Sequence, residues 1–255
     1  MTNWRELTEE LDRWPAGKAT FWWRDDDATV PSSALARLIA LGPQPLAIAV
    51  IPARAERALA GLLDGERIDV LQHGYAHVNH EPDGHKRAEL GSARPAGVVI
   101  EELSEGRRRM EALFGPRHLA VLVPPWNRIA DGVAARLPEA GLHGLSAYRA
   151  RPRSSSQPPR RVSTPHRVNT HVDILDWRAG GRFIGSNAAI ALAIAHLAAR
   201  RRDEADPAEP TGLLTHHERM DEDAFAFTRT LLARLASHRA VQWLAARDIF
   251  TGGSC

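Results

Sequence analysis

Short apolar runs recur along this chain, and longer amphipathic stretches separate them. Apolar runs bounded by Gly and Pro predict buried strands, and apolar residues at helical spacing predict helices. The predicted strands cover residues 21–23, 46–51, 68–71, 119–123, 142–146, 168–175 and 212–215, with a shorter one at 240–243. The predicted helices cover residues 3–14, 31–41, 53–63, 95–114, 131–140, 186–202 and 221–237. This alternation predicts one α/β domain, spanning residues 1–255, around a parallel sheet.

Seven or eight strand–helix units suit a closed or partly closed barrel. An open doubly wound sheet is the alternative, and such a sheet usually carries a glycine-rich phosphate loop after its first strand. The first strand here leads into Asp25-Asp26-Asp27-Ala28, which lacks glycine and would repel phosphate. The pattern therefore favours the barrel.

Two polar segments interrupt the alternation. Residues 81–94 are too many for an ordinary connection, so they form either a functional loop or a poorly ordered one. Residues 151–165 are rich in Pro, Ser and Arg and predict an exposed loop.

Composition narrows the possible functions. The 255 residues are 44% hydrophobic, which is enough for a large core, and the formal charge is only +2 without a sustained basic stripe. We therefore expect no nucleic-acid partner. The only cysteine is Cys255, which excludes a disulfide framework and a cysteine zinc site.

No apolar run approaches the ~20 residues needed to span a bilayer. The first residues, from Met1 to Leu7, lack the apolar core of a signal peptide. We therefore expect a cytoplasmic protein without a membrane span, and the sequence says nothing of its oligomeric state.

Residues suited to catalysis, metal binding or substrate binding lie just after five of the predicted strands. These clusters are the three aspartates, then His73 to His80, Pro124 to Arg128, Asp176-Trp177 and His216-His217. The carboxyl ends of parallel strands form one face of an α/β fold, and that face holds the active site. We interpret the five clusters as parts of one site.

His73 and His77 are four residues apart, so on a helical turn they share a face and can hold one ion. Imidazole suits zinc and similar divalent metals. The adjacent carboxylates of residues 25–27 repel one another and call for a cation, either Arg24 or a metal. An aspartate with the two histidines would make a three-ligand site with an open position for water. Alternatively, the histidines lie on the surface without a metal and the aspartates form an acidic turn that caps a helix. His80 could replace one of the two histidines as a ligand or could contact a ligand without binding the metal.

From residue 21 to residue 217, these segments resemble the polysaccharide deacetylase family, carbohydrate esterase family 4. Its second motif, His-Ser/Thr-x-x-His, matches residues 73–77, with Gly74 in the Ser/Thr place. Its fourth motif, which ends in Asp-Trp, matches Asp176-Trp177, and its fifth, Leu-x-His, matches residues 214–216. The resemblance implies a divergent member with a deformed (β/α) barrel of about seven parallel strands.

The first motif, Thr-Phe-Asp-Asp-Gly, meets three aspartates, so two registers are open. Laying the motif on residues 24–28 makes Asp26 the catalytic base and Asp27 the metal ligand, whereas the shifted register assigns these roles to Asp25 and Asp26. We prefer the first, because the motif's small final residue then falls on Ala28. The third motif matches residues 124–126, but Val123 stands where the family has an arginine that supports the base, so Arg24 or Arg128 is expected to compensate.

The resemblance implies a metal-dependent hydrolase that removes the acetyl group from an N-acetylated sugar or a related small amide. Asp27, His73 and His77 would bind one divalent ion, with zinc expected first and nickel, cobalt or manganese as alternatives. Metal-bound water would be the nucleophile, Asp26 would take its proton, and His216 would protonate the leaving amine.

Further residues take supporting roles in this interpretation. Asp176 is expected to orient a catalytic partner, a backbone N–H at Trp126 to hold the oxyanion, and His217 to replace His216 if the register slips by one. The expected substrate-binding residues are Pro125, Trp126, Arg128 and Trp177.

Three rival functions stay open. One is a hydrolase of another C–N bond, in a cyclic amide or ureide. The second is a non-catalytic carbohydrate-binding relative, which the missing third-motif arginine would suit, and the third is a structural α/β domain without a metal. A cytoplasmic deacetylase would act on a lipid- or nucleotide-linked sugar or an oligosaccharide precursor, rather than on a cell-wall polymer.

Overall fold

The computed structural model describes residues 4–151 and 165–251. The main sheet has nine strands in this part of the chain, in the order β6-β5-β4-β3-β2-β1-β10-β7, and β11 pairs with the start of β1. All of these pairings are parallel. The strands of this sheet are β1 (Ala19–Ala28), β2 (Leu46–Val50), β3 (Ile68–His73), β4 (His118–Val123), β5 (Gly144–Leu145), β6 (His166–Arg167), β7 (Val172–Asp173), β10 (Thr211–Thr215) and β11 (Val241–Trp243).

A separate antiparallel hairpin joins β8 (Leu175–Asp176) to β9 (Arg182–Phe183). The α-helices are α1 (Trp4–Leu11), α2 (Ser33–Ile39), α3 (Arg57–Leu62), α4 (Ala96–Phe114), α5 (Asp131–Ala134), α6 (Ser186–Arg201), α7 (Glu222–Ala236) and α8 (Ala246–Thr251). Short 3₁₀-helices follow several strands, among them η1 (Pro52–Arg54), η3 (Pro125–Asn127), η6 (Trp177–Ala179) and η7 (His217–Arg219). Two others flank helices, η2 (Gly115–Arg117) and η4 (Leu137–Ala140).

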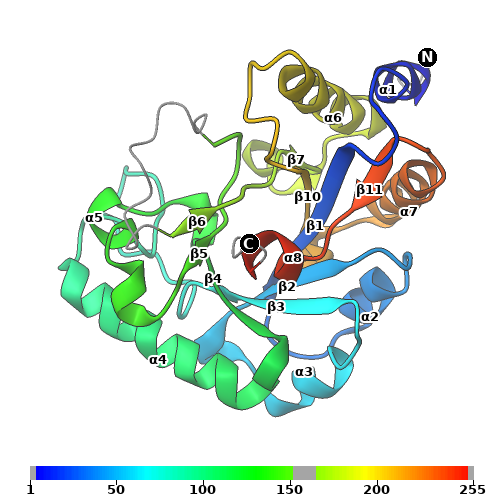
Figure 1. Ribbon diagram of the computed structural model, residues 1–255. Helices are drawn as coiled ribbons and strands as arrows, with labels where there is room; N and C mark the ends of the chain where they lie inside the picture. Colours follow the sequence, from blue (N-terminus) through cyan, green and yellow to red (C-terminus); the bar gives the residue numbers. More distant parts are fainter. Residues whose placement is uncertain (1–3, 152–164, 252–255) are drawn as a thin grey trace.

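The sheet curls into a deformed (β/α) barrel, which confirms the predicted fold class (Figure 1). The segment from His166 to Asp173 connects the two edge strands of the curled sheet, β6 and β7. His166 of β6 pairs with Gly144 of β5, and Val172 of β7 pairs with Leu213 of β10. The predicted sixth strand over 168–175 is therefore interrupted: β6 ends just before residue 168, and β7 and β8 begin in the second half of the predicted range. The physical reason is a change of partner midway along the segment.

Side-chain alternation along β1 divides the core into two layers. Successive side chains of a strand point to opposite faces. Trp22 packs with small residues of β2 such as Ala47 inside the barrel, whereas Phe21 and Trp23 face the surrounding helices. The three aromatic residues that lead into the carboxylates are thus buried on both faces of the strand, as a central parallel strand requires.

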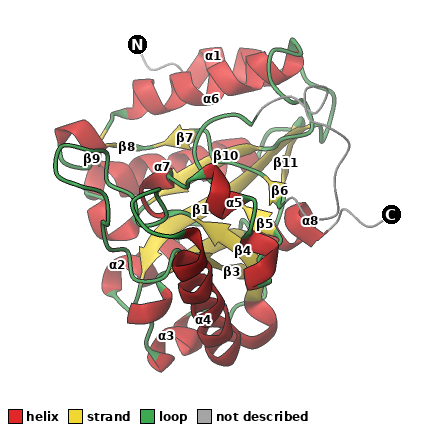
Figure 2. Cartoon of the chain, turned by 90° about the vertical axis from the view of Figure 1, so that its left-hand side faces the viewer, coloured by secondary structure: helices red, strands yellow, loops and turns green. Residues whose placement is uncertain are grey.

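Apart from α8, which packs against the inner layer, the helices lie on the outer side of the curled sheet. α4 contacts β3 and β4, while α6 contacts β7 and β10 and is joined there by α1 (Figures 1 and 2). The last helix, α8, was not predicted. It docks through Arg247, whose backbone N–H and guanidinium both bond Asp69, and its Phe250 ring lies 6.1 Å from Trp22.

No helix in the described ranges has the length and apolar character that crossing a bilayer would require. Most of the predicted exposed loop at 151–165 lies outside the described residues, which stop at residue 151 and resume at residue 165.

Candidate active site

Arg24 and Asp26 form a buried ion pair on the inner face of β1. Because they are two residues apart in a strand, their side chains leave the same face. The guanidinium meets the carboxylate through two hydrogen bonds, Nε to Oδ1 at 2.8 Å and Nη2 to Oδ2 at 3.0 Å. Arg24 is fully buried, and it also donates to the Asn127 side chain and to the hydroxyl of Ser146. The pair therefore holds the Asp26 carboxylate in one orientation.

Asp27 breaks the alternation of β1. Its φ is +75°, in the left-handed region that a residue with a side chain seldom adopts, and the pairing of β1 with β2 shifts register between Asp25 and Ala28. A bulge of this kind redirects a side chain. It turns the Asp27 carboxylate toward the end of β3, where Oδ1 lies 3.1 Å from Nε2 of His73 and 3.3 Å from Nε2 of His77.

The donor atoms of Asp27, His73 and His77 fit a divalent metal. They lie within 4.8 Å of one another. His73 donates its Nδ1–H to the carbonyl of Val123 at 3.0 Å, which leaves the Nε2 lone pair directed at the site. Two ligands about 2.1 Å from one tetrahedral ion are separated by about 3.4 Å, close to the spacings observed here. The predicted ligand set is thus brought together by the fold.

The charges at this site keep Asp27 ionised. Burial raises the pKa of Asp27, but the hydrogen bond with His73 and the nearby histidine charges outweigh burial and hold that pKa well below its usual range. Burial lowers the pKa of His73, yet Asp27 and Asp26 raise it above the ordinary value. Burial and the neighbouring His73 lower the pKa of His77. The lowered pKa of His77 favours its neutral imidazole, and a carboxylate beside a neutral imidazole is a donor set for a cation.

Glu89 fixes the loop that carries His77. Its buried carboxylate accepts three backbone N–H bonds, from Tyr75 at 3.0 Å, Ala76 at 2.7 Å and His77 at 3.0 Å. Gly74 has φ +57°, and a Cβ there would overlap this carboxylate, which explains why glycine takes the Ser/Thr place of the motif. No motif in the sequence marks Glu89. The 81–94 segment was expected to be either a functional loop or a poorly ordered one, and the part around Glu89 is built into the site.

The residues after β4 form the opposite wall beside His77. Trp126 has φ +55°, and its ring lies 4.3 Å from the His77 ring, while Pro125 is buried beneath. Arg128 does not approach Asp26, because its guanidinium donates to the carbonyl of Arg87 at 2.7 Å. Pro125 and Trp126 therefore adjoin the predicted metal ligands, and Arg128 lies on the outer part of this wall.

His216 lies across the site from the metal ligands. It follows β10 and is buried, and its Nε2 is 3.9 Å from Oδ2 of Asp26. The Trp177 ring meets the His216 ring edge-on at 4.6 Å. The Nδ1 atom of His216 is buried without a hydrogen-bond partner among the described residues.

Besides Asp26, the buried carboxylate that interacts with this histidine belongs to Asp173 rather than to Asp176. Asp173 is buried, accepts the Trp177 Nε1–H at 2.9 Å and interacts electrostatically with His216. Asp176 is exposed, and its carboxylate accepts the N–H groups of Arg178 and Ala179 at the start of η6. The orienting role predicted for Asp176 stays a prediction, and the geometry favours Asp173 for it. The sequence contains Asp173 three residues earlier, at the end of β7 rather than of β8.

Asp25 pairs with His217 on the outer face of β1. One carboxylate oxygen bonds the His217 ring through Nδ1, and the other accepts from the Thr215 hydroxyl at 2.7 Å and the His217 N–H at 3.0 Å. This accounts for the third aspartate. Asp25 was the alternative base and His217 the alternative acid, and in the structure these two side chains bond each other. His80 is exposed and lies outside the cluster of possible metal ligands.

No protein-family model matches the sequence, and no curated protein matches it at a significant level. Solved structures do match the fold. A Mycobacterium smegmatis protein assigned as a polysaccharide deacetylase superposes with a TM-score of 0.63 at 18% identity, covering 91% of this chain and 88% of that one. A carbohydrate esterase family 4 esterase from Streptococcus mutans gives 0.59 at 9% identity, with coverage of 94% and 90%. A family 4 carbohydrate esterase from Streptomyces lividans, in complex with acetate, gives 0.53 at 14%, with 90% and 91%.

The chain has the polysaccharide deacetylase fold. Within that fold, the third-motif arginine expected at residue 123 is a buried valine here, and Arg24 on β1 occupies the position of a partner to Asp26. Arg24 is therefore placed to compensate for the missing arginine and Arg128 is not, and the compensating role stays a prediction. The Arg24 guanidinium reaches the Asp26 carboxylate from a position two residues earlier on β1.

A second histidine cluster of this deacetylase fold does not suit a metal. His171, His196 and Glu209 are buried together, but the two imidazole rings stack 3.4 Å apart at only 12°, so their nitrogen lone pairs lie in nearly parallel planes. Nδ1 of His171 accepts the Gly212 N–H, which puts the ring proton on Nε2. Burial, with the charges of His171 and Arg200, lowers the pKa of His196 to about 2. The cluster is a neutral stack beside a buried arginine.

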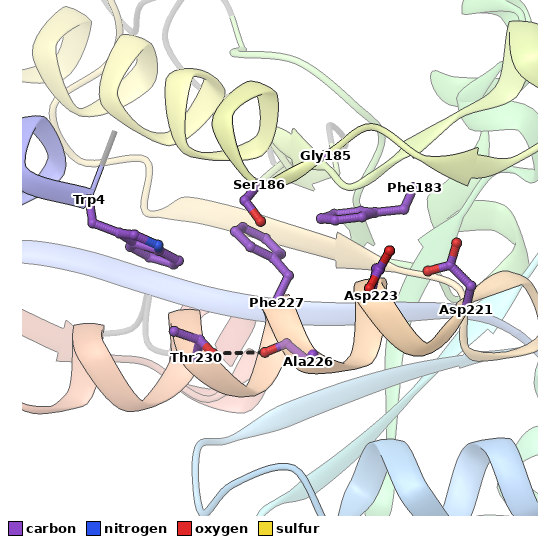
Figure 3. Close-up of a pocket in the computed structure, with 9 residues that line it drawn as sticks. All are labelled: Trp4, Phe183, Gly185, Ser186, Asp221, Asp223, Ala226, Phe227 and Thr230. Atoms are coloured by element: carbon purple, nitrogen blue, oxygen red, sulfur yellow. Dashed lines mark hydrogen bonds between the residues drawn. The ribbon is translucent and has the colours of Figure 1, made fainter. Parts of the chain in front are cut away.

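A surface hollow of about 560 Å³ lies apart from these residues (Figure 3). Trp4, Phe183 and Phe227 line one part of it and Asp221 another, between α1, the start of α6 and α7. None of the candidate metal ligands or acid–base residues lines it. The candidate site of this fold is instead the rim at the carboxyl ends of β1, β3, β4 and β10.

Proposed function

We propose that this protein is a metal-dependent hydrolase that removes the acetyl group from an N-acetylated sugar. The observation that carries the proposal is the convergence of Asp27, His73 and His77 beside a carboxylate and a histidine on opposite sides of one site. The deacetylase fold supports it, because these side chains all lie at the carboxyl ends of parallel strands, which is where α/β barrels carry their active sites.

Asp27, His73 and His77 would hold one divalent ion, with zinc as the first expectation for a set of two histidines and one aspartate. When bound, such an ion supplies electrophilic polarisation of a carbonyl and makes water more acidic.

Asp26 takes the proton from the attacking water. Its two hydrogen bonds from Arg24 aim the carboxylate and keep it from turning toward the metal ligands. A positioned general base of this kind contributes about 10²–10⁴-fold to a rate. The pair is fully buried, so its geometry does not depend on solvent.

His216 donates a proton to the leaving nitrogen from the other side of the site. Its Nε2 faces the same space as the Asp26 carboxylate, and Trp177 packs against the ring and limits its rotation. Asp173, held by the Trp177 Nε1–H, stabilises the charged imidazole through its own negative charge. Trp126, beside His77, supplies a wall for the acetyl group and, through its backbone N–H, a donor to the developing oxyanion.

Incubation of the metal-loaded protein with N-acetylated sugars, followed by measurement of released acetate, tests this proposal. We expect acetate from at least one N-acetylated sugar and none with the Asp26→Asn variant. Turnover of a cyclic ureide, with no acetate from any sugar, would show that another C–N bond is the target.

A further inference from the structure

An exposed tryptophan and three exposed arginines share the rim beside His216. We call Trp177, Arg178, Arg182 and Arg219 the rim patch. β8 and β9 pair so that Asp176 lies opposite Arg182, which brings the arginine back beside the start of η6. A Cβ on Gly181 would lie 3.3 Å from the Trp177 ring and 3.9 Å from Cδ of Arg219. The hairpin and η7 thus bring the patch together on one small surface.

Trp177 is held in place although 48% of it is exposed. Its Nε1–H is tied to the buried Asp173 at 2.9 Å, and its ring packs edge-on against His216. A large aromatic side chain that is fixed from below and open above is typical of a ligand contact, because exposing it otherwise costs free energy.

The three arginines of the patch form no ion pair with any residue of the described ranges. Arginines on outer helices do form such pairs, as Arg108 does with Glu105 on α4. The two carboxylates in the same segments are engaged elsewhere. Asp176 accepts backbone N–H groups, and Glu218 lies 3.3 Å from Nε2 of His217.

We propose that the substrate is an N-acetylated sugar phosphate, whose phosphate group binds the arginines of the rim patch while Trp177 covers the sugar ring. This rests on the proposed deacetylase function. A guanidinium group binds phosphate oxygens through two parallel hydrogen bonds and is the side chain best matched to that group. Because the patch adjoins His216, the phosphate lies on the side of the sugar that carries the amide nitrogen.

Acetate release from four compounds tests the proposal and separates the sources of the phosphate. The compounds are N-acetylglucosamine 1-phosphate, UDP-N-acetylglucosamine, a lipid-linked N-acetylglucosamine diphosphate in detergent, and the uncharged methyl glycoside of N-acetylglucosamine. We expect kcat/KM to be at least about tenfold higher for a phosphorylated compound than for the methyl glycoside, mainly through KM. This preference falls as salt is added, because salt screens exposed charges. The phosphorylated compound with the highest kcat/KM identifies the source.

Arg182→Gln and Arg219→Gln are each expected to reduce the preference for the phosphorylated compound about tenfold, as the loss of a charge-assisted hydrogen bond would. Arg108→Gln, at an exposed arginine on α4, is the matched control and should leave the preference as it is. Thermal unfolding of each variant checks that the fold is kept.

Equal kcat/KM for charged and uncharged sugars, unaltered in the patch variants, would overturn this inference and leave the deacetylase function standing. Absence of acetate from all four compounds and from other N-acetylated sugars would instead overturn the proposed function, and this inference with it.

Discussion

Asp26 and Asp27 are adjacent, yet the backbone between them sends their carboxylates to different partners. Regular strand geometry keeps Asp26 on the face of Arg24, and the positive φ of Asp27 turns its side chain to His73 and His77. A left-handed conformation at a residue with a side chain costs about 1–3 kcal/mol and is retained where it serves a site. The bulge is therefore the feature that separates the proposed base from the proposed metal ligand.

Replacing Arg24 with lysine should lower kcat about 10²-fold with a smaller effect on KM. Lysine keeps the positive charge but cannot make the two parallel hydrogen bonds that orient Asp26, and a small misplacement of a catalytic group costs about that much. Steady-state kinetics checks this, with Arg109→Lys as the control, since Arg109 on α4 bonds the Ala55 carbonyl rather than a carboxylate. A fully active Arg24→Lys enzyme with an unaltered pH profile would remove the arginine from the account.

Asp173 gives a prediction with a definite sign. Burial raises the pKa of Asp173, and the charge of His216 and the hydrogen bonds from Leu175 and Trp177 offset this only in part. A raised folded-state pKa means that the contribution of Asp173 to stability is present below the unfolded value of about 3.8 and is lost as pH rises through the folded value.

The Asp173→Asn variant should therefore gain stability relative to the wild type between pH 4 and pH 7, while its kcat falls. Urea unfolding at several pH values measures the first effect, and acetate release measures the second. Asp83→Asn, in the exposed part of the 81–94 segment, controls for the loss of a surface charge. A relative stability of Asp173→Asn that declines over this range would contradict the assignment.

At the scale of elements, the seam between β1 and β10 is fastened by polar groups as well as by the strand pairing. Asp25 lies opposite Thr215 in the register, and the Thr215 hydroxyl joins Asp25 to the Trp23 Nε1–H. The ring of His217 bonds the same carboxylate. Asp26 follows Asp25 on β1, and His216 follows Thr215 at the end of β10. The bonds across this seam therefore set the distance between Asp26 and His216.

Removal of His217 should cost about 3–5 kcal/mol of unfolding free energy, because it leaves the buried Asp25 carboxylate without its charged partner. Burial lowers the pKa of His217, but Asp25 and Glu218 raise it overall, so this stabilisation is complete below about pH 6.5 and is lost as pH rises through the folded value.

Urea unfolding of His217→Ala at pH 6 and pH 9 measures both effects. The difference from the wild type should be larger at the lower pH. His238→Ala is the matched control, since His238 pairs with the exposed Asp12 at 3.3 Å and such a pair contributes at most about 1 kcal/mol. An equal cost for both variants would show that the seam is not held by this pair.

The loop after β3 is held from within by Glu89, and this connection sets the position of His77. Glu89→Gln should weaken divalent-metal binding about 10–100-fold, the usual effect of losing a partner that orients a ligand. Titration calorimetry with zinc on metal-free protein checks this. Asp83→Asn, in the exposed part of the same loop, should bind zinc as the wild type does, and tight binding by Glu89→Gln would show that the loop is ordered without that carboxylate.

At the scale of the whole molecule, much of the architecture is predictable from the sequence alone. Most of the order of strands and helices, the barrel, and the gathering of an aspartate of residues 25–27 with His73 and His77 at one rim were predicted from apolar runs and from the polar residues directly after them, and the family resemblance selected Asp27. These features depend on local periodicity and on the rule that the carboxyl ends of parallel strands lie at one edge of the sheet. Both can be applied to the sequence without knowledge of the three-dimensional structure.

Other features depend on contacts between distant residues, and the sequence did not predict them. Glu89 acts through backbone N–H groups 12 to 14 residues away, which no motif records. Arg24 was expected as a cation for the carboxylates, but its paired hydrogen bonds to Asp26 were not, because β1 continues through the carboxylates to Ala28 whereas the strand was predicted to end at residue 23. The break between β6 and β7 results from a change of partner, which becomes visible only when the barrel closes.

The divalent-metal content of purified protein tests the central claim most directly, by elemental analysis of the wild type beside Asp26→Asn and Asp27→Asn. We predict about one ion per chain in the wild type and in Asp26→Asn, and its loss in Asp27→Asn, because only Asp27 lies within ligand distance of both histidines. A wild-type protein that takes up no divalent metal, or a metal lost with Asp26 and kept without Asp27, would contradict the account.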